Sequence, residues 1–112
     1  MLTIDALKAY GANVQEGLAR CMNNEAFYLR LVKMGANDAN FRKLSDALAN
    51  RDLAAAFEAA HALKGVLANL ALTPVLQPVV EATELLRART DTDYAPLAAR
   101  IDEAHRKLLE IL

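Results

Sequence analysis

Apolar residues recur along the chain at intervals of three and four positions, which is the period of an α-helix that buries one side. Alanine and leucine dominate, β-branched residues are sparse, and no Asn-Gly or Asp-Gly turn separates alternating strands. The pattern therefore predicts an all-α protein without a sheet.

Capping and breaking residues divide the pattern into helices. We expect helices over residues 3–10, 14–22, from 25 through 34, over a segment holding Phe41, Leu44 and Leu48, and over 53–70, 77–89 and 94–111. Gly11 ends the first, and Asn23-Asn24 and Asp52 are predicted N-caps. Gly35, Asn37 and Asp38 offer a C-cap followed by an N-cap, which indicates a break or kink.

The start of the sixth helix is set by two prolines. Thr73-Pro74 is the pattern of an N-cap followed by proline at the first helical position. Pro78 would remove a hydrogen bond from a helix already running through it, so we expect the start nearer Gln77. Four substantial helices joined by short turns predict an antiparallel four-helix bundle with short additional N-terminal helices, in one domain over residues 1–112.

Composition narrows the possible functions. The chain has 112 residues, of which 54% are hydrophobic and 24% charged, with a formal net charge of −1. A chain of this size buries enough surface to fold without metals or disulfides. Proteins that bind nucleic acids usually carry a broad positively charged surface. A chain with a net charge near zero does not have one, so we expect no nucleic-acid ligand.

The sequence also bears on the cellular compartment and on metal binding. Cys21 is the only cysteine, and no Cys/His spacing fits a metal site. The first residues lack the pattern of a signal peptide, and the longest uncharged run, between Lys64 and Glu81, is interrupted well short of a membrane span. We expect a cytoplasmic protein, independent of membranes and bound metal, and monomeric because transient partners need only a modest interface.

The helix predicted over residues 53–70 has one apolar side. At about 100° per residue, its apolar residues fall in one sector expected to face the core: Leu53, Ala56, Phe57, Ala60, Leu63, Leu67 and Leu70. His61 projects roughly 130° from the centre of that sector, so we expect an accessible imidazole. Ala54, Gly65 and Ala68 share its face, and Lys64 stands at the boundary between the apolar stripe and solvent.

Gly65 needs a physical reason, because a glycine inside a helix costs roughly 1 kcal/mol relative to alanine. Close approach of another surface would explain it. Small residues around the ring let a second protein bring a reactive group to His61, and Lys64 supplies a cation for anionic oxygens. Neutral imidazole is a nucleophile near neutral pH and forms a phosphoramidate that can pass its phosphoryl group on. The arrangement favours phosphoryl transfer.

These residues also resemble a known family. His61-Ala62-Leu63-Lys64-Gly65, followed by Asn69-Leu70, resembles the His-x-Leu-Lys-Gly signature of histidine-containing phosphotransfer (Hpt) domains. Similar segments at 17–20, 27–28 and 52–57 extend the resemblance over nearly the whole chain. It implies a helical bundle whose histidine, matching His61, takes a phosphoryl group from a receiver-domain aspartate or a hybrid histidine kinase and hands it to another receiver. It also implies that Mg²⁺ and the acidic pocket belong to the receiver, so this chain needs no cofactor of its own.

Residue by residue, the resemblance makes His61 the phosphoacceptor and Lys64 the cation for the phosphoryl oxygens. Gly65, with Ala68, Asn69 and Ala54, would form the surface on which the partner docks. The chain departs from the usual family pattern at three positions, which are Gly35, Leu67 and Ala71. We expect these departures to affect local packing and the exit turn of the helix more than the chemistry of His61.

Two other functions remain open from the residues. One is a degenerate bundle that binds receivers or another helical partner without transferring phosphate; the other is a phosphoacceptor module of a chemotaxis-type kinase. No glycine-rich phosphate loop is present, so we expect no autonomous kinase activity. His105 stands among charged residues, where we expect a solvated side chain with no role.

Overall fold

A computed structural model describes residues 1–112 as seven helices and no strand. The helices are α1 (Ile4–Tyr10), α2 (Val14–Arg20), α3 (Glu25–Ala36), α4 (Asn40–Ala49), α5 (Leu53–Asn69), α6 (Thr73–Arg87) and α7 (Ala95–Glu110). The all-α prediction is confirmed. None of these helices combines the length and apolarity that crossing a membrane requires.

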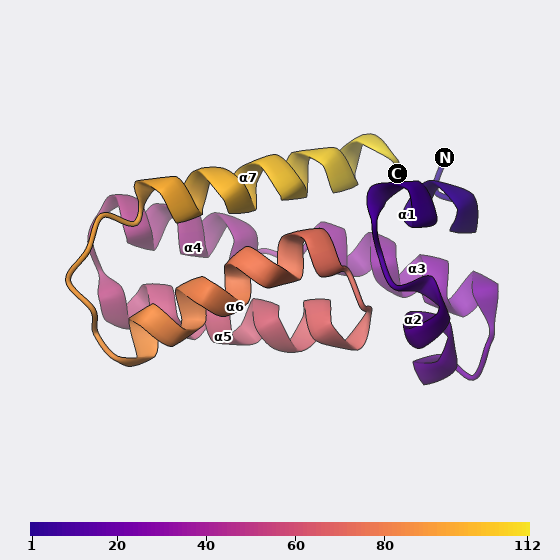
Figure 1. Ribbon diagram of the computed structural model, residues 1–112, viewed down its shortest axis with the longest axis horizontal. Helices are drawn as coiled ribbons and strands as arrows, with labels where there is room; N and C mark the ends of the chain where they lie inside the picture. The colour runs from indigo at the N-terminus through magenta and orange to yellow at the C-terminus, as the bar shows by residue number, and fades with distance from the viewer.

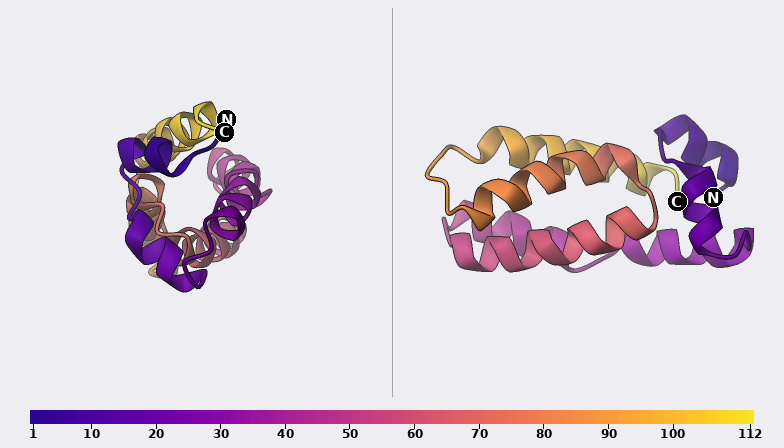
Figure 2. Two further views of the ribbon diagram at one scale, coloured as in Figure 1. Left: turned by 90° about the vertical axis from the view of Figure 1, so that its right-hand side faces the viewer. Right: turned by 60° about the horizontal axis from the view of Figure 1, so that its bottom comes forward.

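Helices α4 to α7 form the predicted antiparallel bundle (Figure 1). Helix α5 packs against α4 on one side and α6 on the other, and α6 packs against α7. Helix α3 prolongs the line of α4 at one end, where α1, α2 and the two chain termini also lie (Figures 1 and 2). The end-on view in Figure 2 shows the helices arranged around a shared core. The N-terminal helices thus cover the end of the bundle at which α5 finishes.

Side-chain caps set most of the helix starts. Thr3, Asn13, Asn24 and Asp52 each accept a hydrogen bond from the backbone N–H three residues later. The predicted break between α3 and α4 is confirmed: α3 ends at Ala36, and Asp38 Oδ1 accepts a hydrogen bond from the Asn40 N–H at 2.7 Å.

The predicted start of α6 near Gln77 is wrong. The helix begins at Thr73 with Leu72 as its N-cap, and Pro78 lies inside it. Pro74 falls in the first turn, where a missing N–H costs no helix bond. Burial outweighs the bond lost at Pro78, because Leu72, Val75 and Val79 are fully buried and hold this turn in the core.

The core confirms most of the apolar sector expected on α5. Ala56, Ala60, Leu63 and Leu67 are buried, and Phe57 is half-buried at the edge of the sector. The regular spacing of methionine and phenylalanine also suggests that Met22 and Met34 are core residues, and this is wrong, since both are exposed. Met22 has a left-handed φ of 55° and lies in the turn after α2, outside the regular helix on which the spacing argument depends.

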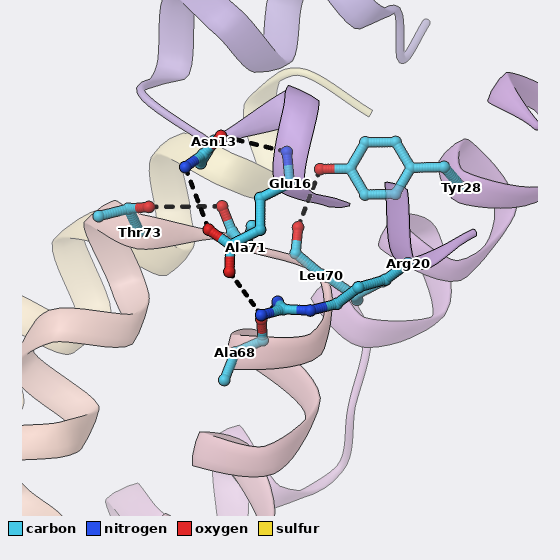
Figure 3. A network of polar contacts seen from close by, with 8 residues as sticks. All are labelled: Asn13, Glu16, Arg20, Tyr28, Ala68, Leu70, Ala71 and Thr73. Atoms are coloured by element: carbon cyan, nitrogen blue, oxygen red, sulfur yellow. Dashed lines mark hydrogen bonds and ion pairs between the residues drawn. The ribbon is translucent and has the colours of Figure 1, made fainter. Parts of the chain in front are cut away.

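The turn after α5 is held by the N-terminal helices (Figure 3). The Arg20 guanidinium donates to the carbonyl of Ala68, and the Tyr28 hydroxyl donates to the carbonyl of Leu70 at 2.9 Å. The Asn13 N–H donates to the carbonyl of Ala71 at 2.9 Å. The Tyr28 bond satisfies a carbonyl that the helix end leaves without a partner, and the other two add to bonds that Ala68 and Ala71 accept from the Ala71 N–H and the Thr73 hydroxyl. Segments far apart in sequence therefore fix the end of α5.

Candidate functional site

His61 lies on the exposed side of α5, as the periodicity predicts. Ala54 and Gly65 on the same face are exposed, and Ala68 is partly exposed. Leu63 and Leu67, on the opposite side of the helix, are fully buried. The fold thus anchors one side of α5 and presents the imidazole among small side chains.

Gly65 differs from the other glycines of the chain. A Cβ at Gly17 would lie 2.5 Å from Cε1 of Tyr28, and one at Gly35 would lie 2.8 Å from Cδ1 of Leu70. Gly11 has a φ of +107°, which favours glycine. At Gly65 a Cβ would meet nothing within 4 Å, so packing within this chain does not require glycine there. Its presence four residues after His61 leaves the helix surface there without a side chain and open to solvent.

Lys64 lies at the boundary expected for it, with its side chain 35% exposed. Its Nζ is 3.9 Å from Oε1 of Glu84 on α6, and Oε2 of the same carboxylate is 3.7 Å from Nε of Arg87. One carboxylate therefore holds two cations. The sequence alone does not indicate that Glu84 and Arg87 belong to the site, because their position beside Lys64 depends on how α6 packs against α5.

An aromatic contact borders the imidazole on the α6 side. The Phe57 and His61 rings are stacked, with centroids 5.6 Å apart and an interplanar angle of 18°. The guanidinium carbons of Arg87 and Arg89 lie 5.3 and 5.8 Å from the centroid of the Phe57 ring. Phe57 thus packs beside the imidazole, and its ring is also contacted by two arginines. The i, i+4 spacing of Phe57 and His61 is visible in the sequence, but the arginines are not.

Asn69 lies at the other edge of this face and is exposed. It lines a shallow groove of about 270 Å³ whose other residues come from α3, the turn after it and the end of α5: Leu31, Met34, Gly35, Asp38, Val66 and Leu70. The groove adjoins the α5 face at Asn69, which lies one helical turn after Gly65. The structure thus adds an apolar border that the sequence did not predict.

The three positions at which the chain departs from the usual family pattern differ in their surroundings. Gly35 lets α3 approach Leu70 and Val66 on α5, since a Cβ there would lie 2.8 Å from Cδ1 of Leu70 and 3.2 Å from Cγ1 of Val66. Leu67 is fully buried in the core. Ala71 has a left-handed φ of 56°, a conformation in which glycine is unstrained and alanine is not.

His105 is not the solvated side chain expected from its charged neighbours. Its ring stacks on Phe41 with centroids 3.6 Å apart, and Nε2 lies 2.7 Å from the carbonyl oxygen of Ala36. The side chain therefore joins α7 to the end of α3. Its sequence neighbours do not reveal this, because the two partners come from distant segments.

The assembled face combines an accessible nucleophile with cations and room for a second surface. No three His, Cys, Asp or Glu side chains gather in a group that could hold a metal ion. The imidazole of His61 can accept an electrophilic group, and Lys64 can contact its anionic oxygens. The geometry suits transfer of an anionic group between proteins.

Comparison with known proteins agrees with this geometry. Residues 35–111 match the sequence model of the Hpt domain family. The match includes α4 to α7 and the end of α3, and hence His61 and both helices that border it. Neither the curated proteins nor the solved structures gave a match.

Proposed function

The chain belongs to the Hpt domain family, and from this premise we propose that His61 carries a phosphoryl group between the receiver-domain aspartates of a phosphorelay. Domains of this family are phosphotransfer modules of two-component signalling and work with receiver domains and histidine kinases. The proposal assigns this activity to one residue and places this chain between two receivers, with a hybrid histidine kinase as the first source of phosphate.

The empty space at Gly65 is the observation that carries the proposal. Every other glycine has a reason within the fold, while Gly65 has none and lies one helical turn from an exposed imidazole. Ala54 and Ala68 continue this low surface. A receiver can therefore bring its phosphoaspartate to the ring, with Asn69 and the groove beside it at the edge of the contact.

The proposed reaction uses the unprotonated ring nitrogen of His61. This nitrogen forms a bond to phosphorus, the bond from phosphorus to the aspartate oxygen breaks, and the aspartate leaves as a carboxylate. The charge lost from the receiver appears on His61, where the Lys64 ammonium stabilises it. Any Mg²⁺ is proposed to reside in the receiver, and the carrier is proposed to act as a cytoplasmic monomer.

Transfer of labelled phosphate tests this function. Purified receivers of the same genome are phosphorylated and mixed with wild-type protein, His61→Gln or His105→Gln. We expect acid-labile, base-stable label on wild type and on His105→Gln, and none on His61→Gln. Circular dichroism checks that the variants are folded.

Two results would contradict the proposal. Label on His61→Gln would place the phosphate on another residue. Folded wild-type protein that takes up no label, yet binds a receiver equally well after His61→Ala, would identify a binding module without transfer.

A further inference from the structure

We propose that Glu84 is a positioning residue that holds Lys64 and Arg87 while His61 is free and releases them to the phosphoryl group. This inference rests on the proposed function of His61. It gives a role to a carboxylate that neither the sequence motif nor the match to the family assigns.

The geometry of the ion pairs shows how Glu84 can act on both cations. Its two oxygens face different partners, with Oε1 3.9 Å from Lys64 Nζ and Oε2 3.7 Å from Arg87 Nε. Both distances exceed those of a close hydrogen-bonded pair. The side chain of Glu84 is 58% exposed, that of Lys64 35% and that of Arg87 50%. Pairs that are long and exposed are weak, so a stronger anion can displace the carboxylate.

Both cations are within reach of the surface around His61. Lys64 follows His61 by three residues and therefore lies beside it on α5. Arg87 lies against the Phe57 ring, which in turn stacks on the His61 ring. The Glu84 carboxylate thus lies between Lys64, which neighbours His61 on α5, and Arg87, which contacts the ring stacked on the imidazole.

Phosphorylation changes the charge balance of this cluster. With His61 neutral, Lys64, Arg87 and Glu84 sum to one positive charge. A phosphoryl group adds up to two negative charges and three acceptor oxygens, so it attracts both cations more strongly than one carboxylate does. The same group repels Glu84. The carboxylate therefore competes with the phosphoryl group and weakens its hold on the carrier, which favours passing it on.

An equilibrium measurement with a small phosphodonor tests this competition without a partner protein. Phosphoramidate transfers its phosphoryl group to the ring nitrogen of His61: the bond from phosphorus to the donor nitrogen breaks, a bond to His61 forms, and ammonia leaves. At fixed phosphoramidate and ammonium concentrations, ³¹P NMR gives the ratio of phosphorylated to free protein. His61→Gln identifies the signal of interest.

Glu84→Gln should raise this ratio roughly two- to fivefold, the range open to an exposed ion pair. Glu81→Gln is the matched control, since Glu81 lies on the same helix, is similarly exposed and pairs with Arg100 instead. It should leave the ratio unchanged. Glu84→Asp should restore part of the wild-type ratio, and salt near 1 M should reduce the effect of Glu84→Gln.

A double-mutant cycle separates competition from a purely structural effect. In a Lys64→Met background, Glu84→Gln should change the ratio less than in the wild-type background, because one of the two cations is gone. If Glu84→Gln, Glu81→Gln and wild type gave equal ratios of phosphorylated to free protein, the role of Glu84 would be overturned, while the proposed function of His61 would stand. Wild-type protein that is phosphorylated neither by phosphoramidate nor by receivers would overturn the proposed function, and this inference with it.

Discussion

Gly65 has opposite effects on folding and on the proposed docking. In the interior of α5 glycine is a poorer helix former than alanine, and nothing in the fold occupies the space that a side chain would fill. Gly65→Ala should therefore raise the free energy of unfolding by about 1 kcal/mol. Urea denaturation followed by circular dichroism measures this change.

Gly65→Leu tests whether the open space serves a partner. Leucine is also a better helix former than glycine, so the variant should be at least as stable as wild type. Its side chain would project beside His61 into the space that an approaching receiver needs, and transfer of labelled phosphate should fall at least tenfold. Transfer at the wild-type rate would show that the partner does not approach over Gly65.

The charge of Lys64 is expected to affect phosphotransfer more than folding. Lys64→Ala removes the cation next to His61 but breaks only a long, partly exposed ion pair with Glu84. Stability should change by less than about 1 kcal/mol, while phosphotransfer to His61 should slow several-fold. Parallel thermal melts and transfer assays check this, and an equal loss in both would indicate a structural role for Lys64.

At the scale of the element, the sequence predicts a helix reliably but not what packs beside it. The period of α5 correctly placed His61 outside and Leu63 inside, and Asp52 correctly marked its start. Glu84 and Arg87 could not be found in this way, because their distance from Lys64 depends on the packing of α6. Tertiary burial likewise overrode the local cost of Pro78 at the start of α6.

Gly17 tests the packing between helices, because the fold requires a residue without a side chain there and does not at Gly65. Gly17 on α2 faces the ring of Tyr28, and a Cβ there would lie 2.5 to 2.7 Å from three of its atoms. Gly17→Ala should lower the free energy of unfolding by about 1–3 kcal/mol, even though alanine favours helix. The same substitution at Gly65 should have the opposite sign, so the two denaturation curves control each other.

For the whole molecule, the family match includes the bundle α4 to α7 but leaves out α1, α2 and most of α3, which pack on one end of it. The match begins at residue 35, whereas Arg20 and Tyr28 donate to carbonyls at the end of α5. Tyr10 similarly donates to the carbonyl of Ala104 on α7 at 2.8 Å. Helices α2 and α3 therefore hold the end of the helix that carries His61, and α1 is bonded to α7.

Tyr28 makes this link sensitive to alkaline pH. Burial, aided by the nearby Cys21 thiol, raises the pKa of Tyr28 to about 12, whereas an exposed tyrosine ionises near pH 10. Between these values the unfolded chain has lost a proton that the folded chain retains, so the free energy of unfolding must fall as pH rises. Below pH 10 this contribution is fully present.

Tyr28→Phe isolates that proton. The variant should be about 1–2 kcal/mol less stable at pH 8, because the Leu70 carbonyl loses its donor. Between pH 10 and 12 its stability should fall less steeply than that of wild type, by up to about 1.4 kcal/mol per pH unit. The remaining slope belongs to other groups, including Tyr10, whose pKa burial also raises. Urea denaturation at several pH values measures both slopes, and parallel curves would show that Tyr28 ionises equally in the folded and unfolded states.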